Sequence, residues 1–187
     1  MLRDKKPVLL LIDIQCGFED EAYWGGNRNN PDAEVVASKL LDRWRALDLP
    51  RIHIRHSSTN PNSRLHASDS GFAFHPAVMP TADELVLTKH VNSAFIGTDL
   101  SARLDEMATT TVIVAGLTTD HCISTTVRMS GNLGYDTVLV SDAMAAFDKV
   151  DIDGKTWPSE IVHAVSIASL NEEFATIISS QDLLEQL

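Results

Sequence analysis

The chain has few of the features that mark secreted, membrane-spanning or nucleic-acid-binding proteins. Its 187 residues include only two cysteines, too few for a scaffold built on disulfides. No apolar run approaches the roughly 18 residues that a transmembrane helix needs. Lys and Arg number 15 against 26 Asp and Glu, and the resulting net charge of -11 disfavours nucleic acid and anionic membranes as partners. No signal peptide is apparent, so we expect a cytoplasmic protein.

The remaining composition is that of a globular protein, with 44% hydrophobic and 22% charged residues. We expect one domain over residues 1–187, because no linker or repeat interrupts the chain. Strand and helix patterns alternate, which indicates an α/β fold with an open, mostly parallel sheet covered on both faces. The expected strands are 8–14, 50–56, 84–89, 111–116, 135–140 and 175–178. The expected helices are 31–47, 99–107, one opening at 122, and 158–174.

Cys122 stands at a chemically favourable point in this pattern. It follows a buried strand and a short polar turn, at the start of a helical segment. Free backbone N–H groups and the helix dipole at such a position favour thiolate over thiol, as in cysteine nucleophiles. The alternative is that Cys122 is a small buried apolar residue.

Two further reactive residues fall at strand ends. Asp13 ends the first strand and Lys89 ends the third. Ligands of open parallel sheets bind at the carboxyl ends of the strands, so we expect both side chains to lie near Cys122. Asp13 would accept the thiol proton, and Lys89 would hold carboxylate and thiolate in place. The alternative is an ion pair that only orders the sheet edge.

These residues and the run from Gly116 to Cys122 closely resemble the isochorismatase-like cysteine hydrolases, a superfamily that includes nicotinamidases and other amidohydrolases. The resemblance covers nearly the whole chain. It implies a three-layer α/β/α, Rossmann-like fold and an Asp13–Lys89–Cys122 triad. It also implies a cis peptide bond at Leu117–Thr118, with the backbone N–H groups of Thr118 and Cys122 forming an oxyanion hole.

The implied activity is hydrolysis of a small non-peptide amide through a thioester on Cys122. An ester or carbamoyl hydrolase with the same triad is an alternative, as is a catalytically silent binding or assembly subunit. Hydrolysis of isochorismate itself is disfavoured, because the enzymes with that reaction lack the cysteine. The resemblance further implies a homo-oligomer, either a dimer or a tetramer, acting on a small molecule.

We expect neither a metal nor an organic cofactor. The metal-binding pattern of nicotinamidases has no counterpart here, although His53, His56, His66 and His75 leave a chance cluster open. A Gly-rich dinucleotide-binding motif is also absent after the first strand.

The expected walls of the substrate pocket are mostly aromatic or polar residues near the strand ends. They are Phe18, Tyr23, Trp24, His56, Asn92, Phe95 and His121. Loops 17–31 and 57–83 are long enough to shape a lid or wall. The aromatic residues Phe18, Tyr23 and Trp24 could equally well pack beneath the loop instead of lining the pocket. Arg55 would either bind a substrate carboxylate or form a surface salt bridge, and Trp157 would cap the pocket or fill a subunit interface.

Overall fold

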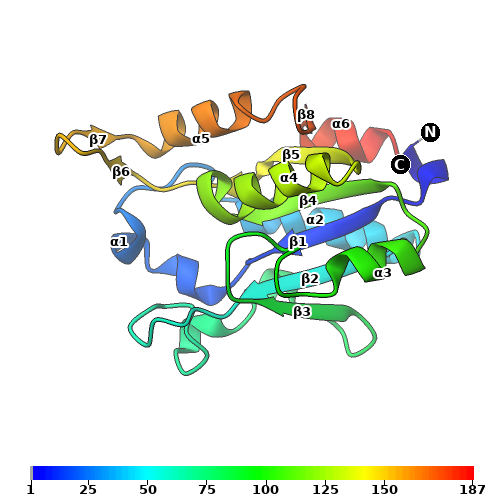
Figure 1. The fold of residues 1–187 in the computed structure, drawn as a ribbon, viewed down its shortest axis with the longest axis horizontal. Helices are drawn as coiled ribbons and strands as arrows, with labels where there is room; N and C mark the ends of the chain where they lie inside the picture. Colours follow the sequence, from blue (N-terminus) through cyan, green and yellow to red (C-terminus); the bar gives the residue numbers. More distant parts are fainter. Residues whose placement is uncertain (1) are drawn as a thin grey trace.

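The computed structural model describes residues 2–187, so Met1 of the expected domain lies outside the described part (Figure 1). The strands are β1 Val8–Ile12, β2 Arg51–His56, β3 Leu85–Lys89, β4 Thr111–Leu117, β5 Asp136–Ala145, β6 Lys149–Val150, β7 Thr156–Trp157 and β8 Thr176–Ile178. The α-helices are α1 Glu21–Trp24, α2 Ala33–Ala46, α3 Leu100–Glu106, α4 Ser124–Asn132, α5 Ser159–Ala168 and α6 Ser180–Glu185. Single turns of other helix types are η1 Leu2–Lys5, η2 Cys16–Glu19, η3 Ser70–Phe72, η4 Pro76–Val78 and η5 Thr119–Ile123.

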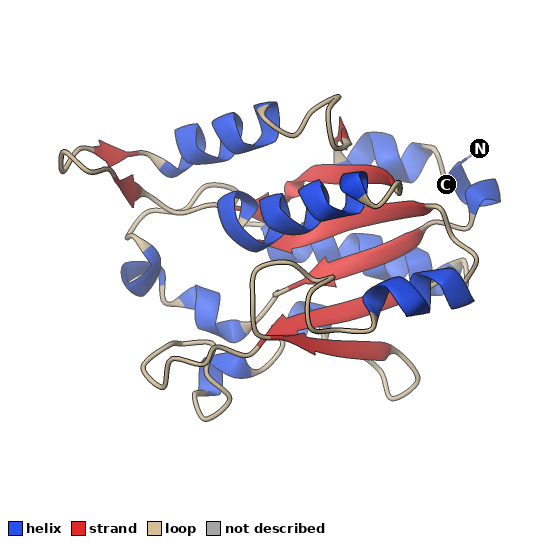
Figure 2. Ribbon diagram, in the orientation of Figure 1, coloured by secondary structure: helices blue, strands red, loops and turns tan. Residues whose placement is uncertain are grey.

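The main sheet confirms the expected α/β architecture. Its six strands lie in the order β3-β2-β1-β4-β5-β8, and every neighbouring pair is parallel. Figure 2 shows helices on both faces of this sheet, which gives the three-layer α/β/α arrangement. None of the described helices is both long and apolar enough to cross a membrane.

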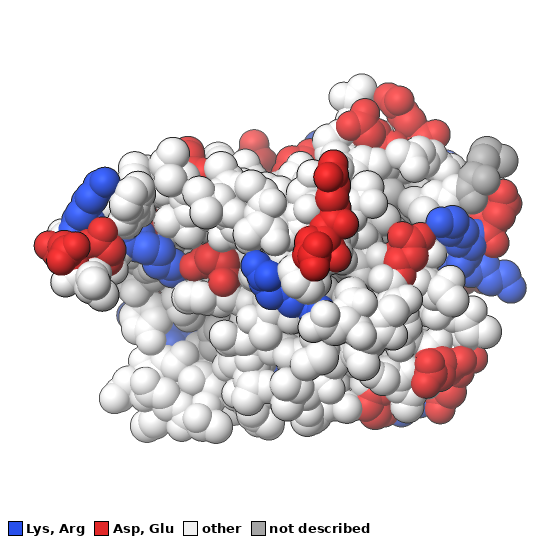
Figure 3. Space-filling view, turned by 45° about the horizontal axis from the view of Figure 1, so that its top comes forward, with Lys and Arg blue, Asp and Glu red and all other residues white. Residues whose placement is uncertain are grey.

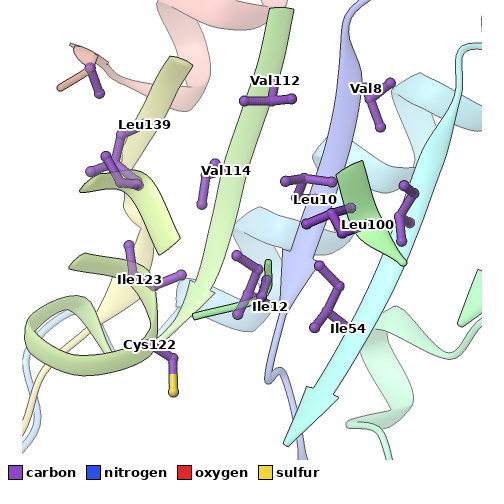
Figure 4. Close-up of a cluster of buried hydrophobic side chains, with 14 of the residues drawn as sticks. Val8, Leu10, Ile12, Ile54, Leu100, Val112, Val114, Cys122, Ile123 and Leu139 are labelled. Atoms are coloured by element: carbon purple, nitrogen blue, oxygen red, sulfur yellow. The ribbon is translucent and has the colours of Figure 1, made fainter. Parts of the chain in front are cut away.

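The strand β1 explains why both faces are covered. Val8, Leu10 and Ile12 join the apolar cluster beneath α3 and α4, whereas Leu9 and Leu11 join the cluster beneath α2 and α6. Successive side chains of a strand point to opposite faces, so a continuous apolar run needs a helix layer on each side. Cys122 lies at the edge of the first cluster, with its sulfur pointing away from the labelled apolar side chains (Figure 4).

The strand β1 ends two residues earlier than expected, and this shortening turns Asp13 toward the site. Asp13 has φ 53°, a left-handed conformation that a strand cannot continue through. Beside it, Gly116 in β4 has φ 139°, and a Cβ there would meet the backbone carbonyl of Ile12. Glycine is therefore required where β1 and β4 approach each other, directly behind the site.

Several expected boundaries were wrong. The helix opening at Cys122 is instead a π-turn, η5, followed by α4 from Ser124. The expected helix 158–174 ends at Ala168, and the chain then turns through Glu172 at φ 66° without a Gly or Pro to mark the break. The strand β5 extends to Ala145, because it follows β4 past a register shift. The hairpin β6–β7 and the helix α6 were not foreseen.

Candidate active site

Asp13, Lys89 and Cys122 meet at the carboxyl ends of the central strands. The Lys89 Nζ lies 2.6 Å from Asp13 Oδ2 and 3.2 Å from Cys122 Sγ. Asp13 and Lys89 are both fully buried, and Cys122 is 7% exposed. Asp13 and Lys89, which are 76 positions apart in the chain, are thus brought to one point with Cys122 by the sheet order β3-β2-β1-β4.

Lys89 also fixes the protonation of His56, which ends β2. The Lys89 Nζ donates to His56 Nδ1 at 3.1 Å and to the Val91 carbonyl at 3.2 Å. An ammonium group has only donors, so His56 Nδ1 must accept, and the ring proton of the neutral imidazole lies on Nε2. Burial and the Lys89 charge lower the pKa of His56 to about 4, which keeps its imidazole neutral near pH 7.

The backbone of His56 is held by Gln15, which is 1% exposed. Its side-chain Oε1 accepts from the His56 N–H at 2.8 Å, and its Nε2 donates to the His56 carbonyl at 3.1 Å and the Phe72 carbonyl at 2.9 Å. Gln15 therefore ties the ends of β1 and β2 to the loop that follows β2, and sequence reasoning had given it no role.

The pKa values of Asp13 and Cys122 differ from the sequence expectation. Burial raises the pKa of the Asp13 carboxyl above its usual value, despite the opposing attraction of Lys89. Burial, reinforced by the neighbouring Asp13 charge, raises the pKa of Cys122 far above its usual range. The raised pKa favours a thiol over the expected thiolate in the resting protein, because desolvation of Cys122 outweighs the attraction of Lys89. The direction of this shift favours the protonated sulfur, and Asp13 is the adjacent group able to take its proton.

The turn before Cys122 has the backbone geometry that the family resemblance implies. The Leu117–Thr118 peptide bond is cis, and Thr118 is extended at φ -95° and ψ 155°. The η5 turn then places Cys122 in contact with the Lys89 ammonium.

A cavity of about 220 Å³ opens above Cys122. Its first wall comes from the loops after β1 and β2, namely Phe18, Tyr23, Trp24, Ser58, Asn60, Ser63 and Leu65. The rest of the lining comes from strand ends and the turn after β4, namely His56, Asn92, Thr118, His121 and Cys122. Loops 17–31 and 57–83 thus shape the cavity wall.

The aromatic residues of the first wall both pack together and line the cavity. The rings of Phe18 and Trp24 have centroids 4.6 Å apart, and Phe18 also stacks on the buried Phe147 at 6.3 Å. The Trp24 indole N–H donates to the Gly17 carbonyl at 2.7 Å, which fixes the ring. These aromatic side chains therefore do both things that the sequence left open. They pack beneath the loop, and they also line the cavity.

Comparison with known proteins assigns this arrangement to a family. The model of the isochorismatase domain matches residues 7–182. The chain is 44% identical over 181 residues to the isochorismatase family protein YrdC of Bacillus subtilis strain 168, covering 97% of this chain and 96% of that protein. The chain belongs to the isochorismatase family.

Structures and further relatives in the isochorismatase family agree with this assignment. A crystal structure from Chromobacterium violaceum, of a protein assigned to the family's hydrolases, superposes with a TM-score of 0.92 at 44% identity, covering 97% of this chain and 93% of that chain. A maleamate amidohydrolase of Pseudomonas putida is 29% identical over 115 residues, covering 62% of this chain and 49% of that protein. These relatives indicate that the general class of activity is hydrolysis.

Phe95 is a correction to the expected pocket of this isochorismatase-family chain. Its ring stacks on Tyr135 with centroids 5.8 Å apart and packs against the core cluster, so it does not line the cavity. The chain after β3 turns inward at Ala94, which is fully buried and directs Phe95 toward the helix layer. Asn92, three residues earlier, does line the cavity, with Oδ1 3.7 Å from Cys122 Sγ.

Arg55 follows neither expected course. Its guanidinium lies 4.5 Å from the centroid of the Phe72 ring, and its Nε donates to Thr88 Oγ1 at 3.1 Å. Trp157 does not line the Cys122 cavity but borders a separate surface hollow along α5. The sequence expectation missed Ser58, Asn60, Ser63 and Leu65, because only the folded course of the loop after β2 brings them to the cavity.

The histidines considered for a metal cluster face different partners. His53 Nε2 lies 2.9 Å from Glu84 Oε2, His66 Nδ1 lies 2.8 Å from Ser68 Oγ, and His75 Nε2 lies 3.3 Å from Glu19 Oε1. Among the described residues, one group could offer metal ligands: Asp13, His56 and Cys122. The Lys89 ammonium contacts all three of these side chains, so a cation of the protein already lies among them.

Proposed function

We propose that this protein is a cysteine-dependent amidohydrolase in which Cys122 attacks the carbonyl carbon of a small amide. The observation that carries the proposal is the contact of one buried ammonium, Lys89, with both Asp13 and Cys122 at the floor of a cavity. A thiol beside an acid–base group of raised pKa and a positive charge is suited to thioester formation, because the base can take the thiol proton and the cation can stabilise the anionic sulfur.

In the first half-reaction, Asp13 takes the thiol proton as the sulfur bonds to the carbonyl carbon. The backbone N–H groups of Thr118 and Cys122 are proposed to stabilise the oxyanion of the tetrahedral intermediate. Asp13 then gives the proton to the leaving nitrogen, the C–N bond breaks, and ammonia or an amine departs. The raised pKa of Asp13 supports both transfers, because the group must accept and release one proton near neutral pH.

In the second half-reaction, a water molecule attacks the thioester while Asp13 takes one of its protons. The C–S bond breaks, Cys122 regains a proton from Asp13, and the carboxylic acid product leaves. The positive charge of Lys89 stabilises the sulfur when the sulfur is anionic. A family relative named as a maleamate amidohydrolase supports the choice of an amide bond.

The test is ammonia release from a panel of small primary amides, with Cys122→Ala and Cys122→Ser as controls. We expect release by the native protein and loss of at least a thousandfold in both variants, with circular dichroism spectra unchanged. Mass spectrometry of the quenched reaction should find the acyl group on the peptide that contains Cys122. Equal ammonia release by Cys122→Ala would contradict the proposal.

A further inference from the structure

We infer that the cavity selects an uncharged amide and rejects amides that also carry an ionised carboxylate. This inference rests on the proposed function and adds the substrate class. It follows from the chemistry of the cavity wall, from the ion pairs around it and from the charge of the whole molecule.

The cavity wall holds no permanently charged side chain, and the Nε2 atom of its exposed residue His121 lies 3.4 Å from Asp120 Oδ2. None of the described residues that line it is Arg, Lys, Asp or Glu. His56 is neutral there, because its pKa is about 4. A carboxylate bound inside would lose its water without gaining an ion pair, and burial of an unpaired charge is strongly unfavourable.

Three cations beside the wall are already paired with carboxylates. Lys89 lies beneath Cys122 and contacts Asp13 at 2.6 Å. Arg64, in loop 57–83 of the cavity wall, contacts Asp20 at 2.7 Å and Asp69 at 3.6 Å. Lys149 contacts Asp120 at 3.4 Å, directly beside the lining residue His121. No member of these pairs adds a net positive charge to the site.

What the wall offers instead is neutral hydrogen bonding beside an aromatic surface. The uncharged polar residues of the lining are Ser58, Asn60, Ser63 and Asn92. Their hydroxyl and amide groups can donate to and accept from a neutral amide. The opposite wall presents Phe18 and Trp24, which suit a planar apolar group. A cavity of about 220 Å³ accommodates a group of one ring or a short chain.

The charge of the whole molecule acts in the same direction. The formal net charge is -11. On the face in Figure 3, acidic side chains are spread widely, and the basic ones do not form a large cluster. The long-range field therefore slows the approach of an anion and leaves the approach of a neutral amide unaffected.

The experiment uses compact diamides and their own half-hydrolysed products, fumaramide with fumaramate and terephthalamide with terephthalamate. Each pair shares its size and its amide bond and differs by one negative charge. We expect the diamide to release one equivalent of ammonia and then stop. The kcat/KM for the diamide should exceed that for the half-amide at least a hundredfold. Both members are also measured as inhibitors of any other amide that the protein hydrolyses, and the neutral member should inhibit more tightly.

A charge-reversal arm locates the selection in the cavity. Asn60 lines the cavity, so Asn60→Lys would add one cation, with Asn60→Gln as the uncharged control. We expect Asn60→Lys, but not Asn60→Gln, to raise kcat/KM for the half-amide at least tenfold. Release of two equivalents at similar rates, or tighter inhibition by the half-amide, would overturn the inference while leaving the amidohydrolase proposal standing. Absence of ammonia from every amide, neutral or charged, would instead refute the proposed function and this inference with it.

Discussion

Replacing Lys89 with methionine tests the buried ion pair on which the site is built. Lys89→Met keeps an unbranched side chain, one atom shorter, but removes its charge and its contact with Asp13. Both partners are fully buried, and their charged atoms lie 2.6 Å apart. At an effective dielectric constant of about 20, the attraction is roughly 6 kcal/mol, part of which the desolvation of the two groups offsets. We therefore expect the variant to lose about 3–5 kcal/mol of unfolding free energy at pH 7, the usual cost of breaking a buried pair.

The loss should depend on pH in a defined direction. Without Lys89, burial alone acts on Asp13, so its folded-state pKa rises further above the unfolded value. The folded variant then holds a proton that the unfolded chain has released, and its stability falls as pH rises toward that folded-state pKa. The slope is about 1.4 kcal/mol per pH unit over this interval. Relative to the native protein at the same pH, the loss should be larger at pH 8 than at pH 5.

Urea unfolding followed by tryptophan fluorescence, to which the fully buried Trp44 of α2 contributes, measures these free energies. The double variant Asp13→Asn with Lys89→Met removes both charges. It should recover at least about 2 kcal/mol of the loss, because no unpaired carboxylate remains. A loss that is equal at pH 5 and pH 8, together with strictly additive effects in the double variant, would refute this reasoning.

Three further predictions concern the backbone, the acid–base group and the cavity wall. Gly116→Ala should cost about 3 kcal/mol or more in urea unfolding, since its Cβ would meet the end of β1, whereas Gly97→Ala, with open space around it, should cost only about 1 kcal/mol. The kcat/KM should fall as pH decreases through the pKa of Asp13, with a midpoint above the ordinary carboxyl value of 3.8. A midpoint at or below 3.8 would contradict the role of Asp13 as the base. Trp24→Leu should raise KM for aromatic amides about tenfold or more, because Trp24 lines the cavity. Phe95→Leu should lower the melting temperature and leave KM unchanged, because Phe95 stacks on Tyr135 outside the cavity. The reverse pattern would show that the cavity wall is wrongly assigned.

The sequence alone was sufficient for the layers and for the reactive residues. Continuous apolar strands alternating with helical segments predict a parallel sheet covered on both faces, because such strands have no side that tolerates water. In parallel strands the carboxyl ends share one edge, so Asp13 and Lys89 could be placed near Cys122 before any coordinates. The family motif from Gly116 to Cys122 added the cis bond and the proposed oxyanion hole.

Local pattern was a poor guide where conformation depends on distant contacts. The helix after Cys122 begins with a π-turn, and the helix 158–174 ends at Ala168, although no Gly or Pro marks either change. Loop residues such as Ser58 and Leu65 reach the cavity through the folded course of the chain, which sequence spacing does not encode. Phe95 packs against the edge of the core instead, with its ring stacked on Tyr135.

The protonation of the site was decided by tertiary structure alone. The sequence placed Cys122 at the start of a helical segment, where a thiolate is favoured, but a pKa depends on how much water the fold removes from the group. Full burial of Asp13 and Lys89 and the near-complete burial of Cys122 leave the resting sulfur as a thiol and make Asp13 the proton carrier. The order of residues thus determined which groups meet, and the packing around them determined which group holds the proton.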